Sequence, residues 1–486
     1  MSDTVEKCDL CIVGAGLAGM NALFVASRYL TSDQRVILVD RRPRVGGMWV
    51  DTYPYVRLHQ PHQMFTAGNI AWTLGQPPSY LATKGEVLDH FEHCLAVIQQ
   101  DLRVDEFFGW TVESEEEIDG VVRVRCRGAD GRTLVIETPK LIKAHGFQVQ
   151  PNEPLALSSR AVHSVSPDTC DMRAAPIRDD SSPVWVVGGG KTAMDTVHAL
   201  VRACPGREVN LLAGGGTFFH NRDFFFPQGL ARWHRGMLVS TLATEVVRRF
   251  DGTNEAEVWD WHRSTCGLAV TPHTANFALG VLSEAEQRAI AGGLNDVVMD
   301  HLVDVVDDAD GATLRLRSGA ERRVEPGSWF VNCTGYLTKR EQPYEPYISP
   351  SGNVLSIQTR SATLHLTSFA AYFATHLLLS GRIREVPLYE LDVFDLYHTS
   401  RKAFAYTLIS LVQYNLSLYA DSIGLRAFRE CGLVFDRWYP MPRQLLANMQ
   451  FARTHRRDRD KLRGILDAAA ERHGVRCGPL VGADAP

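Results

Sequence analysis

Two glycine-rich segments, far apart in the chain, each follow a short apolar run and precede helix-forming residues. The first reads LCIVGAGLAGM, residues 10–20, and the second reads VWVVGGGKTAMD, residues 184–195. Strand, G-x-G-x-x-G/A loop and helix together are typical of a dinucleotide-binding turn, because glycine permits the tight turn and lets the backbone approach a pyrophosphate. A chain of 486 residues is also too long for one ordinary core. The sequence therefore predicts an α/β fold with two Rossmann-like dinucleotide-binding domains.

The first loop is followed by a complete set of binding signals. A second apolar run, RVILV at 35–39, ends at an aspartate whose carboxylate can accept hydrogen bonds from ribose hydroxyls. The helix after the loop offers free N–H groups to the phosphates. The residues predicted to hold this first dinucleotide are Gly14, Gly16, Leu17, Ala18, Gly19, Asp40 and Arg41.

The second loop lacks the acidic residue. Its next strand, VNLLA at 209–213, runs into three glycines. Without a carboxylate to repel a 2′-phosphate, NADPH is favoured over NADH, with Lys191 and Arg222 as candidate cations. A surface ion pair between Arg222 and Asp223 is the alternative for that arginine. The residues predicted to hold this second dinucleotide are Gly188, Gly190, Lys191, Thr192, Ala193 and Arg222.

Two further segments resemble a known family. RRPRVGGMW, residues 41–49, resembles the GGxW segment of flavin-containing and Baeyer–Villiger monooxygenases, although Trp49 read alone is equally a core aromatic. FVNCTGY, residues 330–336, resembles the FATGY element of flavin-containing and N-hydroxylating monooxygenases. The resemblance to these class B flavin-dependent monooxygenases implies FAD in the first domain, NADPH in the second and O2 as the electron acceptor. It adds as cofactor-binding residues Gly47, Met48, Trp49, His59, Gln60, Ala144, Gly146, Thr334, Gly335 and Tyr336.

The segment YPYVRLHQPHQMF, residues 53–65, lies where the family carries SNxP, whose asparagine helps to hold NADP+ and the flavin peroxide. Aligning Pro61 with that proline places His59 in the asparagine position. A histidine there can donate a hydrogen bond, with a charge expected to depend on pH near neutrality. A loop histidine satisfied by the backbone is the alternative. The candidate catalytic residues are His59, Arg57 and Tyr336.

The resemblance implies an NADPH- and O2-dependent monooxygenase that N-hydroxylates an amine or amino acid of a small metabolite, through oxygen added at the flavin C4a position. The Baeyer–Villiger fingerprint F-x-G-x-x-x-H-x-x-x-W retains only His163 within residues 157–167, so ketone or sulfur oxygenation is the alternative. An FAD/NADPH reductase or oxidase is a further one. Disulfide reductases need a redox cysteine pair. The only close pair, Cys8 and Cys11, lies three residues apart in a strand and is not expected to bridge.

The element order predicts four segments. Residues 1–165 form the first part of the FAD-binding domain, and residues 166–335 the NADPH-binding domain, with a helical insertion at about 255–300. Residues 336–390 form the second part of the FAD-binding domain, where 361–381 returns to the flavin as strand then helix. Residues 391–486 form a helical C-terminal segment. A β-meander is expected in each domain, from VVRVRCRG and TLVIET in the first and TLRLRS and ERRVEP in the second.

Composition limits the partners. A hydrophobic content of 45% and a net charge of −5 give no general attraction to nucleic acid or to an anionic membrane. The expected partners are a small-molecule substrate and O2, with a homodimer left open and no metal predicted. The ten dispersed cysteines and the absence of a secretory signal favour the cytoplasm. The apolar stretch at 404–420 is too polar for a membrane span and is expected to be a buried helix.

Overall fold

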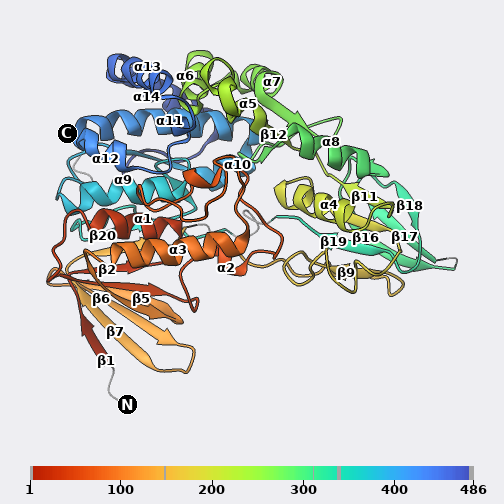
Figure 1. Ribbon diagram of the computed structural model, residues 1–486, viewed down its shortest axis with the longest axis horizontal. Helices are drawn as coiled ribbons and strands as arrows, with labels where there is room; N and C mark the ends of the chain where they lie inside the picture. Colours follow the sequence, from red (N-terminus) through yellow and green to blue (C-terminus); the bar gives the residue numbers. More distant parts are fainter. Residues whose placement is uncertain (1–3, 147–148, 310, 336–340, 481–486) are drawn as a thin grey trace.

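The computed structural model describes residues 4–146, 149–309, 311–335 and 341–480, which form two α/β modules joined side by side (Figure 1). The first module is built on a parallel five-stranded sheet of order β20-β8-β2-β3-β4. Its strands are β2 (Leu10–Val13), β3 (Arg35–Asp40), β4 (Arg103–Phe108), β8 (Leu141–Ala144) and β20 (Val354–Ile357). Most of these strands are buried along their length and apolar, as expected for a parallel sheet covered on both faces.

The second module repeats this arrangement. Its parallel sheet has the order β15-β11-β10-β19-β9. The strands are β9 (His163–Val165), β10 (Val184–Val187), β11 (Val209–Leu212), β15 (Asp296–Val298) and β19 (Trp329–Asn332). In both sheets the strand before the glycine loop is central, and the second strand of the module lies beside it. The predicted fold of two dinucleotide-binding modules is therefore confirmed.

In each sheet, one edge strand comes from outside the stretch of sequence that forms the other four strands. Strand β20 follows the second module in sequence but pairs with β8 of the first, and β9 precedes the second module and pairs with β19. The strand that returns to the first sheet is thus residues 354–357, rather than the start of the predicted segment 361–381. Likewise residues 163–165, expected in the first module, belong to the second sheet, because pairing with β19 completes its edge.

Both predicted meanders form. The first is an antiparallel sheet of β5 (Trp110–Ile118), β6 (Val121–Gly128) and β7 (Thr133–Thr138), extended by β1 (Thr4–Lys7) alongside β7. The second consists of β16 (Leu302–Asp308), β17 (Gly311–Leu316) and β18 (Glu321–Val324). In β6 every second residue is buried, which is the alternation that its sequence VVRVRCRG predicts.

Helices cover the sheets. The helix after the first loop, α1 (Leu17–Ala26), is apolar all round and is packed between α9 (Thr367–Leu379) and α3 (Lys84–Ile98). In the second module α4 (Lys191–Ala203) packs on α8 (Glu284–Gly293), whose predicted capping box of Ser283 and Glu286 is present. A short helix, α2 (Met48–Asp51), and a 3-10 turn, η1 (His62–Met64), lie between β3 and α3.

The helical insertion is longer than predicted. It starts after β12 (Phe218–Asn221), which pairs with β13 (Gly267–Ala269) and β14 (Val281–Leu282) in a small separate sheet. The helical elements of the insertion before α8 are α5 (Arg222–Phe225), η2 (Gly229–Trp233), α6 (Val239–Arg249) and α7 (Glu255–Cys266). They pack against the C-terminal helices instead of the second sheet, so a separate aromatic core forms around Phe218, Trp259 and Tyr406.

The C-terminal segment is helical and begins beside a small sheet of β21 (Ser361–Ala362), β22 (Tyr389–Asp392) and β23 (Cys477–Pro479). Its helical elements are α10 (Val393–Thr399), α11 (Arg401–Ser422), α12 (Leu425–Glu430), η3 (Phe435–Trp438), α13 (Met441–Thr454) and α14 (Arg459–His473). Helix α11 contains the apolar stretch 404–420 and buries most of it, as predicted. Among the described helices, none combines the length and apolarity needed to cross a bilayer.

Candidate functional site

The first glycine loop is closed by backbone contacts that a side chain would break. Gly14 has a φ of +107°, and a Cβ there would lie 2.4 Å from the carbonyl oxygen of Ala144 at the end of β8. Gly16 meets the double glycine of the GGMW segment, since a Cβ on Gly47 would lie 2.7 Å from the Cα of Gly16. The two predicted cofactor segments are therefore in direct contact, and they leave bare backbone facing the cavity beside them.

Asp40 lies at the end of β3, as the ribose-binding prediction requires. Its side chain is only 5% exposed, and its carboxylate accepts hydrogen bonds from the backbone N–H groups of Ala15 at 2.7 Å and Arg42 at 2.8 Å. The carboxylate also lines the cavity. These bonds fix the acid against the loop, and an ionised carboxylate has further lone pairs for a ribose. The residues present therefore fit the adenosine half of FAD.

The second loop reproduces the contacts of the first. Gly188 has a φ of +133°, and a Cβ there would lie 2.6 Å from the carbonyl oxygen of Cys333, the position equivalent to Ala144. Ala193 is buried in the helix, where the first loop has Gly19. A Cβ on Gly190, in contrast, would meet no protein atom within 4 Å. The space over Gly190 is where a pyrophosphate would approach, so this loop fits a second dinucleotide.

Both cations predicted for the 2′-phosphate are ion-paired with carboxylates. Lys191 is ion-paired with Asp195 on its own helix. Arg222 is ion-paired with Glu286 instead of Asp223, and it donates a hydrogen bond to the carbonyl oxygen of His59 at 3.1 Å. Both cations therefore face the junction between the modules.

Side chains other than Lys191 and Arg222 lie beside the three glycines after β11, and the sequence did not predict them. A Cβ on Gly214 would lie 3.2 Å from the imidazole of His301, and Asn276 donates to the carbonyl oxygen of Gly216 at 2.7 Å and is bonded in turn by Arg401. These residues come from later loops, so no local motif marks them. The imidazole of His301 and the guanidinium of Arg401 therefore lie at the end of β11 in the second module, and burial lowers the pKa of His301.

His59 lies between the modules and lines the cavity. Its Nδ1 accepts a hydrogen bond from the backbone N–H of Val281 at 3.3 Å. Burial, together with the charges of Lys191 and Arg222, lowers the pKa of His59 to about 3. The expected charge switch near neutrality is therefore corrected: the ring is neutral at physiological pH. With Nδ1 accepting, the proton of the neutral ring is on Nε2, which makes Nε2–H a fixed donor.

The segment that carries His59 is anchored on the second module by two tyrosines. The Tyr53 hydroxyl donates to the carboxylate of Asp195 at 2.8 Å, and the Tyr55 hydroxyl lies 2.8 Å from the hydroxyl of Thr196. Both hydroxyl partners are on α4, directly after the second glycine loop. The position of His59 is thus linked to the helix that would carry the nicotinamide dinucleotide.

One cavity of about 860 Å³ connects the first glycine loop, Asp40 and His59, whereas neither the second glycine loop, residues 188–193, nor Arg222 lines it. Of the residues predicted to bind cofactor or act in catalysis, it is lined by Gly14, Gly16, Leu17, Ala18, Asp40, Arg41, Gly47, Met48, Trp49, His59, Gln60, Ala144 and Gly146. It continues between α6, α11 and η3 into a chamber with an apolar and aromatic wall. That chamber wall includes Phe225, Leu242, Leu279, Leu408, Val412 and Phe435. No cysteine lines the cavity in the part of the chain that is described.

Several lining residues escaped the sequence analysis. Trp110, His145 and His365 border the dinucleotide end of the cavity, and Phe369 enters it from α9. None belongs to a glycine motif. His145 directly follows Ala144, so its nearness to the predicted loop was the one available signal.

Other predicted residues lie outside the cavity lining. Arg57 is exposed and donates to the carbonyl oxygen of Leu81 at 3.0 Å, with its guanidinium over the Tyr80 ring. Thr334 bonds through its hydroxyl to Asn332 at 2.7 Å, and Gly335 has the left-handed φ of +62° expected of a tight turn. Tyr336 lies outside the described residues. Gly19 packs on Gly14, and Thr192 begins α4 beside Lys191.

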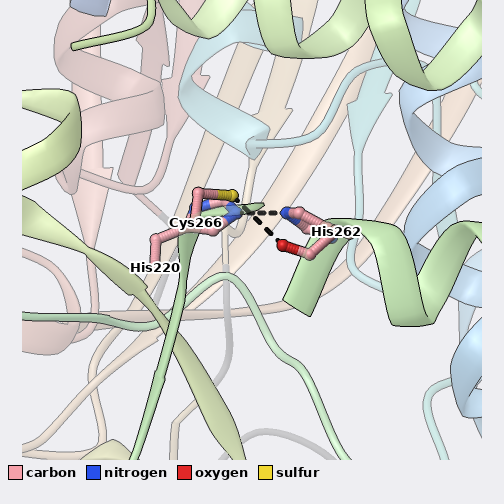
Figure 2. A group of neighbouring side chains, drawn as sticks. All are labelled: His220, His262 and Cys266. Atoms are coloured by element: carbon pink, nitrogen blue, oxygen red, sulfur yellow. Dashed lines mark hydrogen bonds between the residues drawn. The ribbon is translucent and has the colours of Figure 1, made fainter. Parts of the chain in front are cut away.

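Figure 2 shows a group of three potential metal ligands, His220, His262 and Cys266. The two Nε2 atoms are 2.8 Å apart, whereas two nitrogens on one tetrahedral zinc would be about 3.3 Å apart. The Cys266 thiol donates to the carbonyl oxygen of His262 at 3.5 Å, and burial raises its pKa to about 12. His262 Nδ1 also lies 3.3 Å from the Tyr406 hydroxyl. The arrangement is a hydrogen-bonded chain ending at His220, which lines the cavity.

Buried histidines make the protein sensitive to acid. Burial is the main cause that lowers the pKa of His59 and His90 to about 3 and of His262, His365 and His376 to about 4. An unfolded histidine has a pKa of about 6.5, so the unfolded state binds more protons below that pH. Stability is therefore complete above about pH 6.5 and falls as the pH drops towards 4, by about 2 kcal/mol per histidine at pH 5.

We expect the midpoint of chemical denaturation, followed by circular dichroism, to fall steeply between about pH 7 and pH 5. His365→Phe removes one of these titrating groups and should make this pH dependence shallower. An equal stability of the wild-type protein at both pH values would contradict the prediction.

Comparison with known proteins places the chain in a family. The family model of pyridine nucleotide-disulphide oxidoreductases matches residues 8–265, which is more than half of the chain. The chain belongs to this family. Membership of this family, together with the fit of the first glycine loop and Asp40 to a dinucleotide, implies FAD as the cofactor of the first module. The predicted resemblance to two-domain flavoenzymes is thereby confirmed in family and fold.

Individual relatives cover parts of the molecule. An uncharacterized protein of Mycobacterium tuberculosis is 33% identical over 221 residues, which are 42% of this chain and 37% of the relative. The FAD-binding monooxygenase VdtE of Byssochlamys spectabilis is 26% identical over 140 residues, 26% of this chain and 24% of that protein. The chain thus spans well under half the length of these relatives. The open structure of cyclohexanone monooxygenase covers 77% of this chain and 87% of its own, with a TM-score of 0.50 and 12% identity, which shows the shared fold.

Proposed function

We propose that this protein is an FAD-dependent monooxygenase that consumes NADPH and O2. The observation that carries the proposal is the continuous cavity, which runs from the FAD loop past His59 into an apolar chamber without a cysteine in its described lining. A disulfide reductase needs a thiol pair at this place. All ten cysteines are free, and Cys333, beside the second loop, is buried with its pKa raised to about 12. Electrons are therefore expected to pass to oxygen.

The chain's own contribution is binding, orientation and exclusion of water. Bound FAD supplies hydride acceptance and oxygen activation. The glycine loops hold the two pyrophosphates, and the neutral His59 offers Nε2–H at the junction where the family places an amide donor. The aromatic and aliphatic chamber keeps bulk water from the reaction centre. His59 is thus a hydrogen-bond donor whose protonation does not change near neutral pH, as an amide donor at this position would be.

The proposed preference for NADPH rests on the strand end of the second module. After β11 the chain continues as Ala213 and three glycines, with the imidazole of His301 against Gly214. The nearest acid in sequence to that imidazole, Asp300, has its carboxylate occupied by the backbone N–H groups of His301 at 2.7 Å and Ser318 at 3.2 Å. A 2′-phosphate would therefore meet glycine backbone and an imidazole.

For the substrate we propose an amine with a largely apolar body, which is N-hydroxylated. A ketone substrate would need an unneutralised cation at the reaction centre. Lys191 and Arg222, the described cations beside His59, are each paired with a carboxylate. The chamber wall is mostly apolar, and its polar members include Ser240, Glu245 and Gln413, together with Asp436, a buried carboxyl whose pKa is raised by burial. This lining suits an apolar amine better than a free amino acid, whose carboxylate would have to be desolvated.

The test measures how much NADPH oxidation is coupled to the incorporation of oxygen into a product. NADPH should bleach the bound flavin without oxygen, and apolar amines should then raise NADPH oxidation and incorporate oxygen from isotopically labelled O2. Val412→Phe fills the chamber, so it should raise the KM for bulky amines about tenfold and leave flavin reduction unchanged. Bleaching followed by stoichiometric H2O2 release, with no product from amines, ketones or thioethers, would instead identify an oxidase.

A further inference from the structure

Helix α13 presents an apolar face to the outside of the molecule, at the edge of the helical layer (Figure 1). None of its residues is buried. Met441, Leu445, Leu446 and Met449 are 63%, 51%, 68% and 49% exposed. At this spacing the four side chains share one face of the helix. Contiguous exposed apolar side chains of this size mark an interaction surface.

The neighbouring turn extends this face. In η2, Leu230 is 80% exposed and Trp233 is 55% exposed. The Arg443 guanidinium of α13 donates to the carbonyl oxygens of Arg232 at 3.0 Å, Arg235 at 2.6 Å and Gly236 at 3.0 Å. The turn and the helix are therefore fastened together. We call the combined surface the apolar face; it comprises Leu230, Trp233, Met441, Leu445, Leu446 and Met449.

Basic residues outnumber acidic ones around the apolar face. The two segments that form it, residues 224–244 and 439–457, contain no aspartate or glutamate, and Asp223, Glu245 and Asp458 directly flank them. They contain six arginines, Arg232, Arg235, Arg443, Arg453, Arg456 and Arg457, in a chain with a net charge of −5. Arg456 is ion-paired with Asp421 and Arg457 with Asp458, whereas no carboxylate partner is found for Arg235 or Arg453 among the described residues. Arginine and tryptophan beside an apolar helix face are the pattern of a segment that lies in the boundary of an anionic bilayer. In a symmetric dimer through this face, arginines would oppose arginines, which disfavours a second copy as the occupant.

The cavity reaches the surface beside the apolar face. Asn448 and Gln450 of α13 line the cavity and are also exposed. Ala447 and Phe451, on the inner side of the helix, line it as well. The same helix therefore forms the cavity wall with one side and the apolar face with the other.

We propose that the apolar face docks on an anionic lipid bilayer, with α13 lying in the plane of the interface. The apolar side chains enter the acyl boundary, and the arginines meet lipid phosphates. The net charge of the whole chain gives the opposite expectation because it averages over this local basic cluster. The docking proposal is independent of the oxygenase reaction, since it rests on exposed residues outside both glycine loops.

The test uses the flavin-loaded full chain and vesicle flotation. Binding is expected to vesicles of phosphatidylcholine with phosphatidylglycerol, to be much weaker to phosphatidylcholine alone, and to weaken with added salt. Leu445→Ser with Leu446→Ser should reduce bound protein at least tenfold, and Arg453→Glu should weaken binding at low salt and make its dependence on salt shallower. Val303→Ser is the matched control, because Val303 is 63% exposed on β16, away from this face.

Flavin content and NADPH oxidation, measured on every variant, show that the protein is folded and separate this result from the oxygenase proposal. Absence of the wild-type protein from anionic vesicles would overturn the docking proposal. So would binding that Leu445→Ser with Leu446→Ser leaves unchanged, or a dimer that light scattering shows to be broken by those substitutions.

Discussion

Replacing Gly190 with alanine is expected to raise the KM for NADPH at least tenfold while the fold and the FAD content stay unchanged. The added methyl group would meet no protein atom within 4 Å, and Gly190 has an extended backbone (φ −88°, ψ −172°) that alanine adopts without strain. The methyl group would instead occupy the space over the helix N-terminus where a pyrophosphate approaches. The measurement is steady-state flavin reduction against NADPH concentration, with thermal unfolding as the structural check.

Gly188→Ala is the matched control in the same loop. Its Cβ would lie 2.6 Å from the carbonyl oxygen of Cys333, and its φ of +133° disfavours any side chain. This variant should lose at least about 2 kcal/mol of stability and show a lower Tm, because the backbone carbonyl of Cys333 cannot move away from the added methyl group and the backbone strain at Gly188 remains. If Gly190→Ala binds NADPH with unchanged KM, the second loop does not hold the pyrophosphate.

His59→Ala is expected to uncouple NADPH oxidation from product formation. The half-buried imidazole is tied through Nδ1 to Val281 N–H, so its Nε2–H is the donor left for the reaction centre. Removing it deletes a fixed donor and opens space for water, and oxygen reduction should then end largely in H2O2. We expect the product formed per NADPH to fall about tenfold or more, as is typical when one such donor is lost. Quantifying H2O2 and product together tests this.

His59→Asn distinguishes a hydrogen-bonding role of His59 from a structural one. The amide restores a donor of the type that the flavin-dependent monooxygenases carry at this position. It should recover much of the coupling, whereas a purely structural histidine would not be rescued. Because the pKa of His59 is lowered to about 3, the ring stays neutral, and wild-type coupling should be flat between about pH 6 and 8. A coupling step with a midpoint near neutrality that disappears in His59→Asn would contradict this account.

The sequence was a good guide wherever the signal was local. A glycine loop, its preceding strand and its following helix are contiguous, so both modules, both meanders and the capping box at Ser283 were predicted correctly. These features depend on backbone geometry and alternation of side chains, which short segments encode.

The sequence was a poor guide to side-chain pairs whose partners lie far apart in the chain. Lys191 and Arg222 were chosen as phosphate ligands from their positions near the second loop, yet each is held by a carboxylate at the module junction. His301 and Arg401, which approach the glycines after β11 from elsewhere, carry no local signature. Charge pairing is decided by which loops fold together, and a single sequence does not display that.

By itself the sequence determined that this chain folds into two dinucleotide-binding modules of the same plan, because glycines with strained φ and buried apolar strands admit few other structures. Only the tertiary structure decided what fills the junction. It placed a neutral His59 between the modules and joined α6, α11 and α13 around a mostly apolar chamber. It also added β20 to the edge of the first sheet and β9 to the edge of the second. The reason is physical: protonation and cavity shape follow from desolvation and packing among residues hundreds of positions apart.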